Sequence, residues 1–251
     1  ATGFESSDWL DVWSASRAPE NAERVSTDED TGFEPLNGYA LKVTIKKGQK
    51  TGLNLPYQFQ EKMGHEPEAM YFRYYLRLAN NWKPKVSGKM PGFAGTYNRG
   101  GWGGRMSDGF NGWSARGGYA VSAALDEDEY ALGSYVYHAG MQQKYGDSWG
   151  WGRGPTGIVH RNQWYCVEQY VKLNTPGKAD GELKAWLDGN LVFERSDIRF
   201  RDTEDLRIET LWMNVYHGGT SKVPRDVSLF MDNVVVAREY IGPAGSVGDN
   251  N

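Results

Sequence analysis

The 251-residue sequence has one cysteine, Cys166, which excludes an internal disulfide. We expect it to be a small buried hydrophobe, because it lies in the apolar stretch QWYCVEQYV. No apolar run approaches membrane-spanning length, so no membrane partner is expected. The opening ATGFESSDW lacks the pattern of a signal peptide and resembles a mature or trimmed chain, so we expect a secreted, extracellular protein whose signal peptide has been removed.

Several metal and catalytic signatures are also missing. The four histidines lack zinc spacing, and neither G-x-S-x-G nor Glu-x-Asp occurs in the chain. Glu-x-Asp begins the carboxylate motif of many β-sandwich glycosidases, so its absence weakens a hydrolase interpretation. The acidic run 126–129 lacks the EF-hand pattern and predicts a solvated loop, with a structural calcium ion as the alternative. No cofactor or catalytic metal is expected to be required.

Helical periodicity is almost absent, whereas strand-like alternation recurs. One face of the stretch 68–78 can fill a core with Met70, Phe72, Tyr74 and Leu76. The other face is an aromatic and cationic ladder suited to an acidic polysaccharide, formed by Tyr71, Arg73, Tyr75 and Arg77. Other strands are expected at 39–45, 130–140, 164–173, 208–219 and 228–240, and at 183–187 and 191–195 around an Asp188-Gly189 turn. The stretch DWLDVW near the start fits either a strand or a short helical turn.

Many short strands without crossover helices predict an all-β fold, an antiparallel β-sandwich. Neither an internal repeat nor a second composition regime is visible. We therefore expect one domain over residues 1–243, followed by a tail over 244–251, and a monomer.

Aromatic residues are abundant, with 10 Trp, 15 Tyr and 9 Phe. They favour a wet, carbohydrate-binding surface, with a Trp-rich core as the alternative. The net charge of −4 is uneven, because the span 73–116 has eight cations and one acid and the rest of the chain carries −11. This field predicts an anionic ligand bound at one place, although a solvated charge run is the alternative. A nucleic-acid binder would be more basic overall, so no nucleic acid is expected.

Three short motifs could supply chemistry. SGKMPGF places Lys89 beside a Pro-Gly turn, GWSARGG places Ser114 and Arg116 on one strand face, and GSYVYHA does the same for Tyr135 and Tyr137. Each motif alone has an ordinary interpretation, a solvated lysine or packing tyrosines. The glycine-rich stretch between the first two, rich in Trp and Phe, indicates turns and close backbone approach, not a linker or a phosphate loop.

Together the motifs suit β-elimination in a 4-linked uronic-acid chain. That reaction needs a neutralised carboxylate, a base for the C5 proton and an acid for the leaving O4. Arg116 can bind the carboxylate in a planar fork, and a tyrosine can be base or acid. We expect Lys89 and Arg116 to favour the phenolate, by lowering a tyrosine pKa that is ordinarily about 10.

The stretch LWMNVYHGG predicts a cleft strand. Trp212, Asn214 and Tyr216 share a face that can stack on and hydrogen-bond a sugar ring. His217 has core-side parity but lies at the strand end, so its direction is open, and it is the main rival base. Arg73 and Tyr75 of the ladder are also expected to bind substrate.

In this order, the lysine of GKMPG, Ser-x-Arg and Tyr-x-Tyr resemble the alginate and glucuronan lyases of polysaccharide lyase family 14. NTPGKADGELKAWLDG and HGG…FMDNVVV resemble the C-terminal half of that family, so the likeness covers about 68–242. Family 20 glucuronan lyases share the fold. The resemblance implies a concanavalin-like β-jelly roll with a concave substrate groove and metal-independent β-elimination of alginate, polymannuronate or glucuronan. It implies catalytic roles for Lys89, Ser114, Arg116, Tyr135 and Tyr137.

This chain departs from the family pattern in its long glycine-rich insertion and in His138 after the second tyrosine. The alternative of a different class is a non-catalytic carbohydrate-binding module or lectin for acidic polysaccharide. The lysine, arginine and paired tyrosines exceed what sugar stacking needs, and they favour the enzyme.

Overall fold

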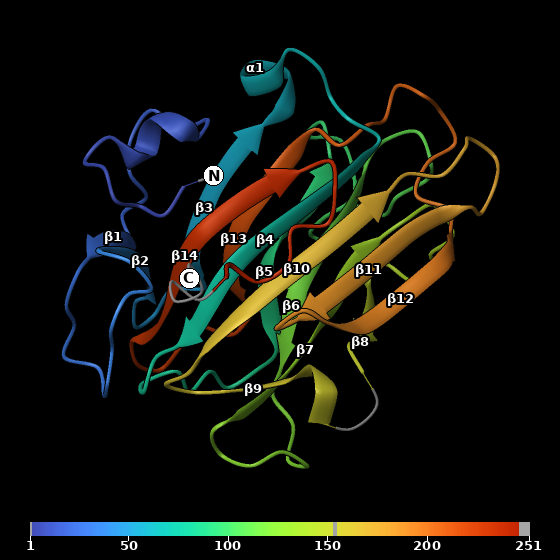
Figure 1. Ribbon diagram of the computed structural model, residues 1–251. Coiled ribbons are helices and arrows are strands. Elements are labelled where there is room, and N and C mark those ends of the chain that lie inside the picture. Colours follow the sequence, from blue (N-terminus) through green and yellow to red (C-terminus); the bar gives the residue numbers. More distant parts are fainter. Residues whose placement is uncertain (1, 153–154, 246–251) are drawn as a thin grey trace.

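The computed structural model describes residues 2–152 and 155–245, whose strands form two facing seven-stranded sheets (Figure 1). The first sheet contains, in spatial order, β1 (Ala22–Val25), β2 (Ala40–Ile45), β14 (Val227–Ala237), β4 (Ala69–Leu78), β10 (Trp164–Lys172), β11 (Gly181–Leu187) and β12 (Asn190–Ile198). The second contains β3 (Thr51–Gln58), β13 (Thr210–His217), β5 (Gly88–Gly95), β6 (Trp113–Ala120), β7 (Glu129–Tyr137) and β8 (Asp147–Gly150), with β9 (Ile158–His160) beside β7. Every pairing between these strands is antiparallel, which confirms the predicted β-jelly roll.

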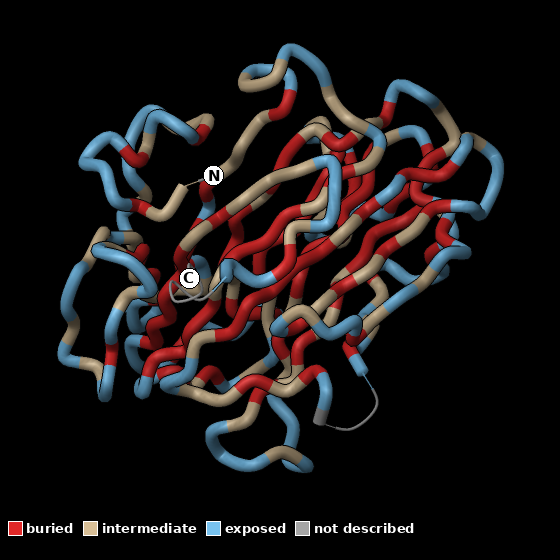
Figure 2. The backbone as a smooth tube through the Cα atoms, viewed as in Figure 1, coloured by how far each residue is buried: buried red, intermediate tan, exposed pale blue. Residues whose placement is uncertain are grey.

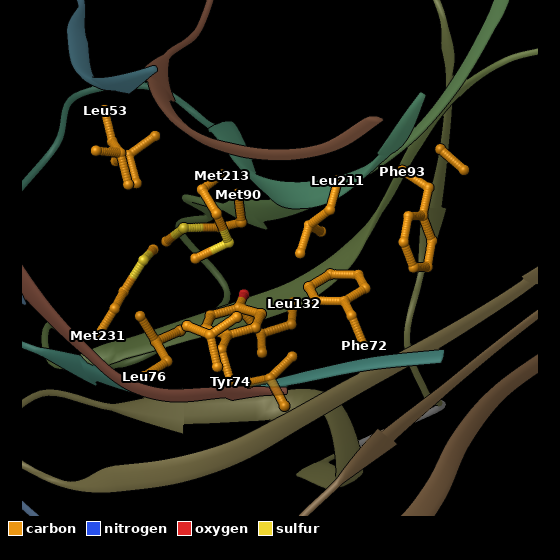
Figure 3. Close-up of a cluster of buried hydrophobic side chains, with 14 of the residues drawn as sticks. Leu53, Phe72, Tyr74, Leu76, Met90, Phe93, Leu132, Leu211, Met213 and Met231 are labelled. Carbon is orange, nitrogen blue, oxygen red and sulfur yellow. The ribbon is translucent and has the colours of Figure 1, made fainter. Parts of the chain in front are cut away.

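The core lies between the two sheets, because every second side chain of a strand points toward the opposite sheet. Side chains from both sheets meet in the cluster of Figure 3, among them Phe72, Tyr74 and Leu76 of β4 and Leu211 and Met213 of β13. Burying one such side chain contributes about 1.5–3 kcal/mol. Figure 2 shows buried residues along the strands and exposed residues in the connecting loops. The predicted core face of β4 is confirmed.

The β11–β12 hairpin closes as its sequence predicts. Asp188 and Gly189 have positive φ angles of 50° and 79°, which match a two-residue turn between twisted strands. Cys166 is free and buried, as expected.

The expected Pro-Gly turn after Lys89 is wrong, because Pro91 and Gly92 lie inside β5. The β5–β6 register shifts between Met90 and Gly92, and this bulge accommodates a proline that has no N–H to donate. A Cβ on Gly92 would lie 2.3 Å from the carbonyl oxygen of Ala115, so glycine permits the close approach of β6.

Helical structure is short. The stretch DWLDVW adopts the helical alternative as the 3-10 helix η1 (Trp9–Val12), and α1 (Phe59–Met63) and η2 (Pro155–Gly157) are the other helices of the described residues. None of the helices found in residues 2–152 and 155–245 combines the length and apolar character needed to cross a membrane.

The aromatic and cationic ladder of β4 does not face a groove, which corrects the expectation that Arg73 and Tyr75 bind substrate. It lies on the outer face of the first sheet, where the C-terminal segment covers Arg73 and Tyr75, and the segment with Asp30 and Thr31 holds Arg77. Arg73 donates to Asn233 Oδ1 (2.8 Å) and the Gly242 carbonyl (3.2 Å), and the Tyr75 hydroxyl accepts the Ala244 N–H (2.9 Å). The alternation of side chains in the sequence predicted that these residues share one face of β4, but it did not predict which segments cover that face. Residues 246–251 of the predicted tail lie outside the described residues.

Candidate active site

A pocket of about 610 Å³ lies over the second sheet, on the face turned away from the core. Strands β3, β13, β5, β6 and β7 supply its floor. It brings together seven of the predicted site residues: Lys89, Arg116, Tyr135, Tyr137, Trp212, Asn214 and Tyr216. Neighbouring strands place these side chains side by side, since Arg116 pairs with Tyr135 and Lys89 with Tyr216 in the sheet register.

Arg116 is buried, at 6% exposed, and has no carboxylate partner within the described chain. Its Nη1 donates to Asn214 Oδ1 (3.3 Å), and its guanidinium lies 4.7 Å from the ring centroid of Trp212. Burial lowers its pKa to about 10, so the group stays charged at neutral pH. A buried cation without a counter-ion is costly to the fold and suits a site that receives an anion.

Lys89 lies beside this arginine. Its ammonium is 4.4 Å from the ring centroid of Tyr135 and 5.6 Å from that of Tyr216. Burial, and secondly the charge of Arg116, lower the Lys89 pKa to about 8. It too forms no ion pair in residues 2–152 and 155–245, and no Asp or Glu is among the described residues that line the pocket. Among the residues that the structure describes, the site therefore holds two adjacent cations and no acid.

The two tyrosines pack edge to face, with ring centroids 5.7 Å apart. Backbone N–H groups of Gly146 and Gly104 donate to the hydroxyls of Tyr135 (3.1 Å) and Tyr137 (3.0 Å) respectively. Burial first, and then Tyr137, raise the pKa of Tyr135, and the opposing charge of Arg116 does not compensate. The expectation that the cations favour a phenolate is wrong for Tyr135, which is held protonated.

Two other predicted site residues lie outside the pocket lining. Ser114 is fully buried and donates to the Gly101 carbonyl (2.6 Å), so it anchors the glycine-rich loop. His217 is also fully buried, on the core side of β13, and its Nδ1 lies 3.1 Å from the Ser221 carbonyl oxygen. The side chain of His217 therefore points toward the core. The expectations that His217 binds substrate and is the rival base are wrong.

Other pocket residues were not predicted. Trp102 and Tyr145 come from loops, and Thr51 and Asn54 come from β3. Asn54 Oδ1 accepts the indole N–H of Trp212 (2.7 Å) and so orients that ring. The only sequence signal was the tryptophan-bearing glycine-rich stretch, which does fold into turns with positive φ angles at several glycines.

No cluster of three His, Cys, Asp or Glu side chains suited to a metal ion occurs in the portions of the chain that are described. In the acidic run 126–129, Glu127 pairs with Lys83, and Asp128 lies 3.5 Å from His160. A structural calcium ion at this run stays a prediction.

Residues 36–233 match the family model of polysaccharide lyase 14. The chain belongs to this family. It is therefore a polysaccharide lyase, a carbon–oxygen lyase, as predicted, and the binding-module alternative gives way to an enzyme.

Solved structures of similar fold include three lyases. A variant of the alginate lyase Aly36B in complex with an alginate tetrasaccharide is 21% identical, with a TM-score of 0.70 over 97% of this chain and 95% of the other. The marine alginate lyase of Aplysia kurodai is 19% identical, with a TM-score of 0.63 over 86% and 87%. The endo-β-1,4-glucuronan lyase of the fungus Trichoderma reesei is 15% identical, with a TM-score of 0.57 over 90% and 91%. A comparison with curated protein sequences returned no match.

Proposed function

We propose that this lyase cleaves a 4-linked uronic-acid polymer, alginate (polymannuronate) or glucuronan, by β-elimination and releases unsaturated oligosaccharides. The observation that carries the proposal is the pairing of Lys89 and Arg116, two cations without a carboxylate partner in the described chain, beside two phenols. An acidic sugar supplies the missing counter-charge. The structures of alginate and glucuronan lyases with the same fold support this substrate class.

In this proposal, Arg116 and Asn214 hold the substrate carboxylate. The guanidinium offers a planar pair of donors, and the Asn214 side chain is fixed by its own bond to the Leu53 carbonyl (3.1 Å). Neutralising this carboxylate makes the C5–H bond more acidic, and the Lys89 ammonium stabilises the negative charge that develops when the proton leaves. Trp212 and Tyr216 offer ring faces on which the sugar can stack.

The two phenols supply proton transfer. A base takes the C5 proton, a double bond forms between C4 and C5, the C4–O4 bond breaks and an acid protonates O4. Tyr135 suits the acid, because burial keeps its hydroxyl protonated. We assign the base to Tyr137, the other phenol that lines the pocket. Glycoside hydrolysis needs two carboxylates about the scissile bond, and none of the described pocket residues is Asp or Glu.

A substrate panel tests the function. Polymannuronate, polyguluronate, glucuronan and other uronans are incubated with enzyme, and the ultraviolet absorbance of the unsaturated product is followed. We expect absorbance to rise with at least one polymer. Saturated products would mean hydrolysis, and binding without cleavage would mean a binding module. Either outcome overturns the proposal.

A further inference from the structure

A second cavity continues the active-site pocket past the edge of the second sheet. It has a volume of about 920 Å³ and shares two lining residues, Thr51 and Asn54, with the pocket. Both shared residues belong to β3, the edge strand of that sheet. The two cavities therefore meet along β3 and form one groove.

The far end of this groove is built by the N-terminal segment, which is tied to the start of β3. The Asn21 side-chain amide donates to the Thr51 carbonyl (2.9 Å) and to Gln49 Oε1 (2.6 Å). These bonds hold the stretch from Arg17 to Asn21 beside the sheet edge, where it lines the second cavity. This stretch precedes the residues that match the family model, so this end of the groove is built partly by chain outside that match.

The charges in the second cavity have the sign that a polyanion needs. Arg17, Lys50 and Lys222 line it and take part in no ion pair within residues 2–152 and 155–245. Glu20, the one acid among the described residues that line this cavity, lies 3.6 Å from Lys46, and its side chain is 83% exposed. Three cations against one acid make this end of the groove net positive.

The groove crosses the strands of the second sheet. From Tyr135 on β7 to Thr51 on β3 there are four interstrand steps, which span about 19 Å at about 4.8 Å each. The second cavity lies beyond that span. A ligand that reaches both ends must be a chain of several sugars, not a single uronate.

We propose that Arg17, Lys50 and Lys222 form a distal binding site for further acidic sugars of the polymer held at the active site. The inference rests on the proposed function, because it takes the same uronan as ligand. The distal site binds carboxylates that do not react, and so it increases affinity for long chains. Since its cations are exposed or half-buried, the attraction is screened by salt.

The test is binding of polymannuronate and glucuronan, and of their trisaccharides, to the full chain by affinity electrophoresis and calorimetry. Every protein compared, the wild-type reference included, also carries Tyr137→Phe, so that the polymer is not cleaved during the measurement. The distal variant is Lys50→Gln with Lys222→Gln. The matched control is Lys47→Gln with Arg225→Gln, which removes the same charge from exposed positions outside both cavities. We expect the distal variant to bind the polymer about five- to tenfold more weakly at low salt, since each exposed charge pair contributes modestly. The loss for a trisaccharide should be several-fold smaller, and the control should match the wild type.

Three results would overturn the distal site. These are equal polymer affinity in the distal variant and wild type, an equal loss in the control, or an equal loss for polymer and trisaccharide. A melting temperature matching the wild type shows that each variant is folded. If the unsubstituted protein binds uronans but cleaves none of them in the substrate panel, the proposed chemistry fails and the distal site is still tested by binding. If the wild type binds no uronan, both proposals fail.

Discussion

Replacing Lys89 with methionine should make the protein more stable at neutral pH while it removes activity. The pKa of Lys89 falls from 10.5 to about 8 in the fold, which corresponds to about 3 kcal/mol at about 1.4 kcal/mol per pKa unit. The side chain is partly exposed and solvent screens its charge, so we expect a gain of about 1–2 kcal/mol in unfolding free energy at pH 7. Turnover should fall about a hundredfold to a thousandfold, as when one electrostatic partner of a transition state is lost.

The pH dependence of the unfolding free energy tests whether the charge of Lys89 causes the stability gain. Below about pH 8 the amine is protonated in both states, so folding of the wild type carries the full cost. Between about pH 8 and pH 10.5 the unfolded chain binds more protons, so the stability of the wild type rises with pH and the gain in Lys89→Met shrinks. Urea unfolding at pH 7, 9 and 10.5 measures this, with Lys47→Met as the control for an exposed lysine. A destabilised Lys89→Met, or a gain that does not change with pH, would refute the reasoning.

Three further results are expected. Tyr137→Phe and Tyr135→Phe should each lower turnover about a hundredfold or more, with polymer binding nearly intact. A substrate with a better leaving group at O4 should restore turnover only in Tyr135→Phe, because that variant lacks the acid. Full activity in either variant would remove that tyrosine from the mechanism. Chelation should leave activity largely unchanged; loss that calcium restores, without a change in circular dichroism, would mean that the electrophile is a metal. Arg73→Ala should lower the unfolding free energy by about 1–3 kcal/mol without changing kcat/KM of the folded enzyme, since the substitution leaves buried acceptors unpaired far from the pocket; a selective loss of kcat/KM would contradict its placement.

Local patterns predicted much of the fold and the centre of the site. Alternation identified β4, β7, β10 and β13, because each strand buries one face against the opposite sheet. The same alternation placed Arg116 with Ser114, and Tyr135 with Tyr137, on shared faces. Those faces meet in one pocket because β6 and β7 are neighbours in the second sheet.

The errors have a common physical origin in long-range packing. Alternation separates the two faces of β4 but does not show that the segment carrying Gly242 and Ala244 covers one of them. Proline and glycine in β5 resemble a turn until its pairing with β6 shows a bulge. Likewise, the pKa of Tyr135 depends on burial by loops that no local pattern predicts, and burial outweighs the nearby cations.

The central claim is that the glycosidic bond breaks by elimination in a pocket whose described lining has no carboxylate. The most direct measurement is product mass after cleavage of glucuronan or polymannuronate in water enriched in heavy oxygen. Elimination adds no water, so we expect unlabelled fragments that carry a double bond at the new non-reducing end, after correction for slow exchange at the reducing end. Saturated fragments whose combined mass exceeds that of the parent chain by one labelled water per cleaved bond would contradict the account.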